Sequence, residues 1–345
     1  MAPSVVICQL LPTGNFVRSG LCLLPTVIFL VACDPAARIV EDDRGRPGSS
    51  DPAMIWSIPT ASGCRLLLAG SLHLLGPEDH PLPQVLLQSL DSCATLFTET
   101  GALSESQSQI ERFVRSRGIL PTGESLQDQE LGAEVARQLE AYLELRPGVA
   151  DRLRSLRPWM ASLQIAMESY RRAGMQRVLG VDAVLLERAT RRGMCIAALE
   201  SPTRQLSGLA DLSRQEQVQL LGGVLGEVLD GTALEDYLNM RQLWRRGDLS
   251  GFSQHVEAQL VEGHGSIEAR MLDERNAHFA ERIAELAGLP PGEAEDCLVL
   301  VGAGHLVGAR GLLARLARRL DSPPVRIMPA GSAEQALSES LPPDG

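Results

Sequence analysis

The sequence predicts an α/β fold with a mostly parallel sheet that is flanked by helices. Two patterns lead to this prediction: short apolar runs alternate with helical stretches, and polar residues come directly after several of the apolar runs. Of the 345 residues 44% are hydrophobic, so the chain has enough apolar material for one large core or two smaller ones. We therefore expect a folded protein and not a disordered chain.

Short apolar runs mark the expected strands. The first two, at 54–59 and 64–71, flank a short turn that ends in Gly63, which predicts an N-terminal β-hairpin. The remaining runs are 94–99, 194–200, 297–302 and 325–329.

Stretches with helical spacing of apolar residues separate these runs. Because strands that alternate with helices pair in parallel, the sheet should be mostly parallel and have helices on its faces. From about 205 to 290 the pattern is helical almost throughout, which predicts a large helical insertion or cap over the sheet. The other helical stretches are 83–93, 132–145, 158–174, 182–193 and 311–320.

The first 33 residues are typical of a lipoprotein-type signal peptide. Arg18 is the only charged residue before the apolar run at 21–33, which is too short to span a bilayer. This run ends in Leu-Val-Ala-Cys and resembles the lipobox of bacterial lipoproteins, so Cys33 is the expected lipidation site. We expect a domain anchored by lipid to a membrane of the bacterial cell envelope, outside the cytoplasm. An N-terminal apolar helix with an incidental cysteine is the alternative.

The rest of the chain divides into three expected segments. Residues 34–51 are polar, charged and rich in Pro and Gly, which predicts a flexible tether. Residues 52–332 form the α/β domain, with the helical cap at 205–290. Residues 333–345 are expected to be a disordered tail.

Charge and cysteine content exclude several classes of protein. The net charge of −11 argues against a nucleic-acid partner, because phosphate binding requires clustered positive charge. All 32 basic residues are arginine, so no lysine is present for Schiff-base chemistry or a Walker-type phosphate loop. The cysteines beyond the signal region lack the spacing of a zinc site, and their pairing stays open: Cys64, Cys93, Cys195 and Cys297.

Polar residues follow several expected strands. His73 comes three residues after Gly70, and His305 comes three residues after Gly302, while a glutamate ends the run at 94–99 and another ends the run at 194–200. Because ligands bind beyond the carboxyl ends of parallel strands, we expect these side chains at one edge of the sheet. Two imidazoles and two carboxylates suit a divalent metal, or acid–base chemistry without a metal.

The glycine of each GxxH motif is expected to be a structural turn residue. Gly70 and Gly302 let the chain leave its strand sharply and so set the direction of the histidine. A single GxxH is typical of a turn followed by a packed histidine. Two copies, each at the end of an apolar run, favour a shared site.

In its ordered motifs the sequence resembles the TraB/GumN family, also written TraB/PrgY/GumN, which is related to the Tiki-type metalloproteases. The matching pieces lie between residues 54 and 315: MIWSIPTASGCRLLLAGSLHLL, FTE, LRPWMASL, LGVDAVLLERATRRGMCIAALES, LDERNAHFAERI and VGAGHLVGARGLL.

The resemblance implies an α/β fold in which His73, Glu99, Arg275 and His305 form one site, with Glu200 as a further candidate. Two positions depart from the family pattern. Thr100 stands where members often have an acidic residue. His278 falls where they tend to have an aromatic one, so we interpret it as a packing residue.

The predicted function is divalent-metal-dependent hydrolysis of an amide or ester in a peptide or a small molecule. His73, Glu99 and His305 would bind zinc, manganese or cobalt, and the metal would activate water. Glu200 would be a fourth ligand or a base. Arg275 would stabilise an oxyanion or bind a substrate carboxylate, or else form a structural ion pair with Glu274 or a nearby helix.

Two other functions stay open: a lipid-anchored protein that sequesters a peptide, haem or metal without turnover, and a purely structural role. Other enzyme classes fit poorly. The segment GAGHLVG has the spacing GxGxxxG and lacks the acidic residue of a dinucleotide site, and the chain contains neither GxSxG nor HExxH.

Overall fold

A computed structural model of the chain describes residues 51–101, 103–262 and 269–328. The expected signal peptide with Cys33, almost all of the expected tether and the expected tail lie outside the described residues.

A six-stranded sheet lies at the centre of the fold, in the order β4-β3-β5-β2-β1-β6. Strands β2, β5, β3 and β4 are parallel to one another, whereas β1 runs antiparallel to both β2 and β6. The predicted α/β class, mostly parallel sheet and N-terminal hairpin are therefore confirmed. The strands are β1 Ile55–Ile58, β2 Leu66–Ser71, β3 Thr95–Thr98, β4 Cys195–Ala198, β5 Cys297–Gly302 and β6 Val325–Arg326.

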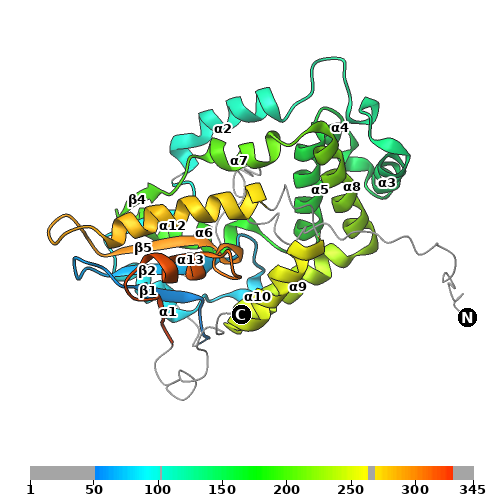
Figure 1. Ribbon diagram of the computed structural model, residues 1–345. Helices are drawn as coiled ribbons and strands as arrows, with labels where there is room; N and C mark the ends of the chain where they lie inside the picture. Colours follow the sequence, from blue (N-terminus) through cyan, green and yellow to red (C-terminus); the bar gives the residue numbers. More distant parts are fainter. Residues whose placement is uncertain (1–50, 102, 263–268, 329–345) are drawn as a thin grey trace, which may run out of the picture.

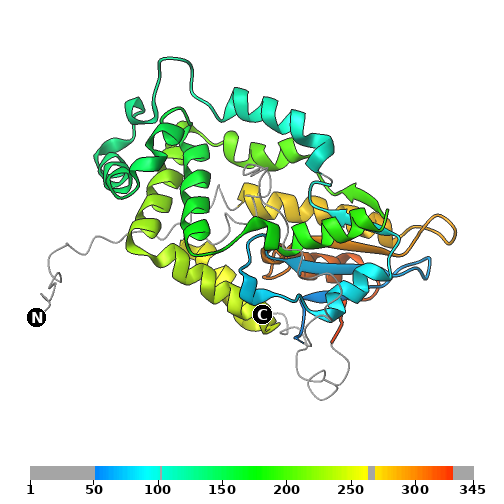
Figure 2. The same cartoon turned by 180° about the vertical axis from the view of Figure 1, so that it is seen from behind.

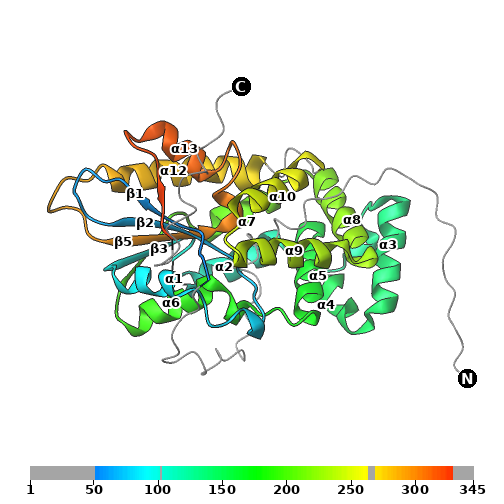
Figure 3. The same cartoon turned by 90° about the horizontal axis from the view of Figure 1, so that it is seen from below.

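Helices cover both faces of this sheet. Seen from below, α12 and α13 lie on one face, and α1 and α6 lie on the other (Figure 3). Every residue of β2 and of β5 is buried, as expected for strands whose continuous apolar runs are covered on both sides. The helices are α1 Gln84–Asp91, α2 Leu103–Arg117, α3 Gly132–Leu145, α4 Ala150–Arg154, α5 Pro158–Arg172, α6 Val181–Arg191, α7 Pro202–Ala210, α8 Arg214–Asp230, α9 Thr232–Arg245, α10 Leu249–Glu262, α12 Glu274–Ala287 and α13 Leu312–Arg319.

The second part of the fold is a helical cap that extends to one side of the sheet (Figures 1 and 2). Helix α8 packs against α5, α3 and α9, and α2 packs against α7. The range 205–290, in which the sequence predicts a cap, contains α8, α9 and α10. Helices α3, α4 and α5 join them, whereas α12 of the same range lies over the sheet.

Local sequence signals fix the helical hairpin of α8 and α9. Ser213 accepts a hydrogen bond from the backbone N–H of Glu216, and the Glu216 side chain accepts one from the N–H of Ser213, which together form a capping box. Helix α8 ends at Gly231, whose φ of 89° lies in the left-handed region that favours glycine. This hairpin places α9 against the loop that follows β2, where Tyr237 donates a hydrogen bond to the carbonyl of Leu74.

The cysteines of the described chain lie at the amino ends of the four parallel strands. Cys195 and Cys297 are the first residues of β4 and β5, and Cys64 and Cys93 come two residues before β2 and β3. All four are free thiols. They lie at the edge of the sheet opposite to the polar residues predicted to form a site.

Candidate active site

The carboxyl edge of the parallel sheet brings the predicted residues to one buried region. His73 follows β2, Glu99 follows β3, Glu200 follows β4, and His305 follows β5. Arg275 reaches the same region from the first turn of α12. None of these five residues is more than 5% exposed.

Arg275 lies at the centre of this region. Its Nη2 donates a hydrogen bond of 2.5 Å to Glu99 Oε2, and its Nε donates one of 2.7 Å to Glu200 Oε1. Its Nη1 lies 3.1 Å from His305 Nε2. Arg275 therefore forms two buried ion pairs, one with each of the strand-end glutamates.

Glu99 is a buried carboxylate that is fully hydrogen-bonded. Burial alone would raise its pKa, but the charge of Arg275, together with the two histidines and the backbone N–H of Gly302, lowers the pKa to about 2. That N–H donates to Oε1 at 2.7 Å, and Gln205 Nε2 donates to Oε2 at 3.0 Å. Glu99 is thus ionised throughout the physiological range.

Glu200 has the opposite tendency. Burial raises its pKa above the usual value, and this effect outweighs the hydrogen bond and charge of Arg275. Oε1 faces Arg275, while Oε2 has no hydrogen-bond partner among the described residues and lies 3.9 Å from Arg204 Nε. Two neighbouring carboxyl groups therefore differ in how readily they hold a proton.

His305 has a defined tautomer. Because an arginine can only donate, Nε2 of His305 accepts from Arg275, and Nδ1 carries the proton that is donated to Asn276 Oδ1 at 2.6 Å. Burial, reinforced by the charge of Arg275, lowers the pKa of His305 to about 3. The ring is therefore neutral at physiological pH.

His73 is held by a carboxylate from a different element. Its Nδ1 lies 2.6 Å from Asp182 Oδ2 at the start of α6, and Ser71 donates a hydrogen bond of 2.9 Å to the other oxygen of Asp182. Burial lowers the pKa of His73, but the charge and hydrogen bond of Asp182 outweigh it, so the pKa is raised. The charge of Glu99 also raises the pKa of His73, and that of Arg275 lowers it.

The two GxxH glycines have different tasks. In the parallel pairing of β2 and β5, Gly70 lies opposite Val301, and Ser71 lies opposite Gly302, so the motifs are out of step by one residue. A Cβ atom at Gly70 would lie 2.6 Å from Leu306 Cδ1 and 3.2 Å from Ala303 Cα, so close packing requires this glycine. Gly302 instead provides the N–H that binds Glu99.

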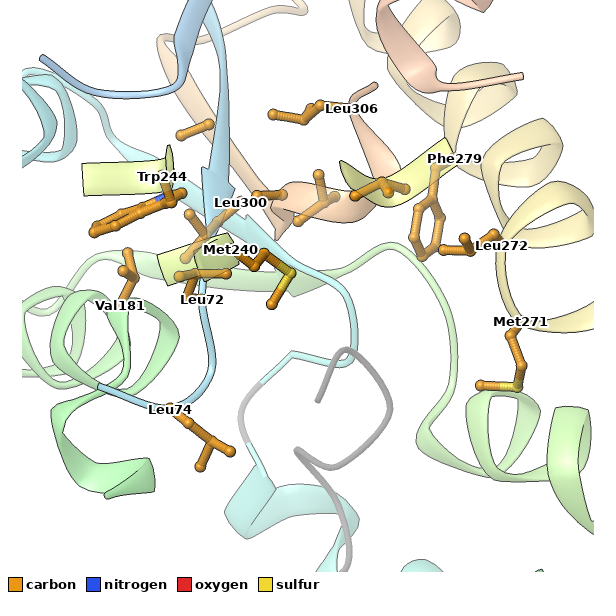
Figure 4. Packing of buried hydrophobic residues seen from close by; sticks show 14 of the residues in the cluster. Leu72, Leu74, Val181, Met240, Trp244, Met271, Leu272, Phe279, Leu300 and Leu306 are labelled. Carbon is orange, nitrogen blue, oxygen red and sulfur yellow. The ribbon is translucent and has the colours of Figure 1, made fainter. Parts of the chain in front are cut away.

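Apolar side chains enclose the site. Figure 4 shows Leu72, Met240 and Trp244 on one side of the strand ends and Phe279 and Leu272 on the other. All are buried. The Phe279 ring lies 5.2 Å from the guanidinium carbon of Arg275 and 5.3 Å from the ring of His305. Apolar surroundings of this kind lower the local dielectric and strengthen the charge interactions.

The sequence interpretation did not include Asp182, Asn276, Gln205 and Ser71. Asp182 is an acidic residue in the first turn of a helix, where such residues are common. Asn276 directly follows Arg275, the residue of that helix that the sequence assigns to the site. No spacing rule connects them to histidines 109 and 29 residues away in the sequence. His278 donates a hydrogen bond to the carbonyl of Leu199 at 3.1 Å.

In the part of the chain that the structure describes, no group of three or more His, Cys, Asp or Glu side chains is arranged to hold a metal ion, and no helix is long and apolar enough to cross a membrane.

Comparisons with known proteins identify the family. No curated protein and no solved structure matches the chain. The sequence model of the TraB/PrgY/gumN family matches residues 54–319, which is most of the chain and contains all of the site residues. The chain therefore belongs to the TraB/PrgY/gumN family.

Proposed function

We propose that the chain is a divalent-metal-dependent hydrolase that cleaves an amide or ester bond, with peptides as the first substrate class to test. His73, Glu99 and His305 would hold zinc, manganese or cobalt. When bound, such an ion supplies polarisation of a carbonyl group and activation of water.

Donor chemistry is the observation that carries this proposal. Nδ1 of His73 and Nδ1 of His305 each lie 2.6 Å from a buried acceptor, Asp182 and Asn276 respectively. In a neutral ring, the acceptor next to Nδ1 keeps the proton on Nδ1 and leaves the lone pair on Nε2. The neighbours of metal-binding histidines orient the ring in the same way. Glu99 adds an ionised carboxylate, because its pKa is about 2. The residues therefore fit a divalent ion in kind.

The remaining polar groups have roles that follow from their charge. Arg275 is never deprotonated, so it stabilises negative charge that develops on a carbonyl oxygen or binds a substrate carboxylate. Glu200 accepts a hydrogen bond of 2.7 Å from Nε of Arg275, so it orients the guanidinium. Phe279 and its apolar neighbours keep bulk water out.

Metal binding by the full-length chain, purified without a histidine tag, tests the proposal. We expect the wild type to bind one equivalent of zinc, manganese or cobalt, and the double variant His73→Gln/His305→Gln to lose it. His255→Gln is the matched control, because His255 is a half-buried histidine on α10 that interacts with Asn239. A folded wild type that takes up none of the three metals refutes the metal-dependent function.

A second candidate is a binding protein that sequesters a peptide, haem or metal without turnover. The burial of the site favours it, because no site residue is more than 5% exposed. A peptide-library cleavage screen with the metal-loaded chain separates the two functions. Stoichiometric metal with cleavage supports the hydrolase, and stoichiometric metal without cleavage supports sequestration.

We also propose that lipid on Cys33 anchors the chain in the bacterial cell envelope. The support is the Leu-Val-Ala-Cys sequence at the end of the apolar run. Cys33→Ser should release the protein from the membrane fraction and abolish incorporation of labelled fatty acid.

A further inference from the structure

The guanidinium of Arg275 uses the same atoms that a metal would use. Its Nη2 is bonded to Glu99 Oε2 at 2.5 Å, and its Nη1 lies 3.1 Å from His305 Nε2. A neutral imidazole has one lone pair, so His305 Nε2 can accept from Arg275 or bind a metal, but it cannot do both. Metal binding therefore requires Arg275 to leave this position.

We propose that Arg275 is a resident cation that a divalent metal displaces from Glu99 and His305, and that Glu200 holds the displaced guanidinium. The inference rests on the proposed function, because it concerns the same metal site. It assigns Glu200 a positioning role, distinct from that of a fourth metal ligand.

Charge balance explains why a cation is present before the metal arrives. Glu99 is buried with Arg275 Nη2 2.5 Å from its Oε2, and a buried carboxylate without a partner is costly in an apolar environment. Arg275 neutralises it. A divalent ion at the same oxygen would neutralise it as well, and the two cations would repel each other at such short range.

The geometry gives the displaced guanidinium a place to go. Nε of Arg275, the guanidinium nitrogen nearest the backbone, already donates a hydrogen bond of 2.7 Å to Glu200 Oε1. Nη2 of Arg275 also lies 2.6 Å from Glu200 Oε1, so a shift of the planar guanidinium toward Glu200 keeps both contacts while Nη1 leaves His305 and Nη2 leaves Glu99. Glu200 Oε2 is buried, has no hydrogen-bond partner among the described residues, and so offers a second acceptor for the guanidinium.

Manganese affinity of the full chain tests this inference, because two variants should change it in opposite directions. Arg275→Gln removes the competing cation and should tighten Mn²⁺ binding about tenfold or more, which is the scale of one charge-assisted hydrogen bond. Glu200→Gln removes the negative charge and one of the two acceptor oxygens that would hold the displaced guanidinium, and it should weaken Mn²⁺ binding. Arg282→Gln, an exposed arginine on the same helix, is the matched control and should leave affinity unchanged.

Thermal unfolding with and without Mn²⁺ shows whether each variant is folded. Should Arg275→Gln alone not fold without metal, Arg275→Gln/Glu200→Gln removes a cation and a carboxyl group together, and it should also bind Mn²⁺ more tightly than wild type. If a folded Arg275 variant binds Mn²⁺ no more tightly than wild type, the inference is overturned. If wild type binds Mn²⁺ in that experiment, the proposed function still stands. If neither wild type nor any variant binds Mn²⁺, zinc or cobalt, the proposed function fails with it.

Discussion

Glu99→Gln should lower the free energy of unfolding by about 3 kcal/mol at pH 7. Lowering the pKa of Glu99 from 4.5 to about 2 means that the folded chain favours the ionised form by about 1.36 kcal/mol for each pKa unit. Removing one partner from a buried ion pair costs about 3–5 kcal/mol in other proteins, which agrees in size. The amide keeps the shape of the side chain, so the loss measures mainly the charge.

The same reasoning gives a pH dependence with a defined sign. The folded pKa is depressed, so the stabilisation by Glu99 is fully present above pH 4.5 and is lost as the pH falls toward 2. At pH 3.5 the wild type should have lost about 1.4 kcal/mol of this contribution. Glu99→Gln lacks this contribution, so the difference in the free energy of unfolding between the two proteins should shrink by the same amount.

Urea unfolding followed by tryptophan fluorescence provides the assay, because Trp56, Trp159 and Trp244 are all buried. Glu134→Gln is the control, since Glu134 forms an exposed pair with Arg137 and should contribute less than about 1 kcal/mol. If Glu99→Gln and wild type have the same free energy of unfolding at pH 7 and at pH 3.5, Glu99 is not a strongly stabilised buried carboxylate.

Three further predictions concern the surroundings of the site. Asp182→Asn should weaken metal binding about 10- to 100-fold in calorimetry, because Asp182 orients His73; an unchanged affinity would argue that His73 needs no such partner. Gly70→Ala should cost about 1–3 kcal/mol in urea unfolding, because its Cβ would clash with Leu306, whereas Gly148→Ala, whose Cβ meets no neighbour, should change stability by less than about 0.5 kcal/mol. Between pH 7 and pH 5 the wild type should lose about 2 kcal/mol more stability than His305→Gln, because the unfolded chain gains a proton below pH 6.5 while the folded His305, with a pKa of about 3, does not; parallel pH profiles would contradict this.

The strand ends were the part of the site that the sequence could predict. A continuous apolar run marks a buried parallel strand, and the residue after it is placed by the sheet itself. For this reason the apolar runs alone predict that His73, Glu99, Glu200 and His305 lie at one edge. The same rule predicts the α/β class and the hairpin, and both are confirmed.

The partners of these residues could not be predicted in the same way. Asp182 and Asn276 lie on helices, and which turn of a helix meets which strand depends on the tertiary packing of the whole fold. The position of Arg275 also depends on competition: its guanidinium takes the buried carboxylates of Glu99 and Glu200, since the cost of leaving them unpaired is greater than for an exposed neighbour such as Glu274.

The strand order has a consequence for synthesis. Strand β5 lies between β3 and β2, yet it comes after all of the helical cap in the chain. While the chain is being made, β1 and β2 on one side and β3 and β4 on the other have no strand to join them until residue 302 has emerged from the ribosome. A nascent chain up to that point also lacks His305 and the N–H of Gly302 that Glu99 requires, so it contains no assembled site. Any activity of this protein therefore begins only once nearly the whole domain has been translated.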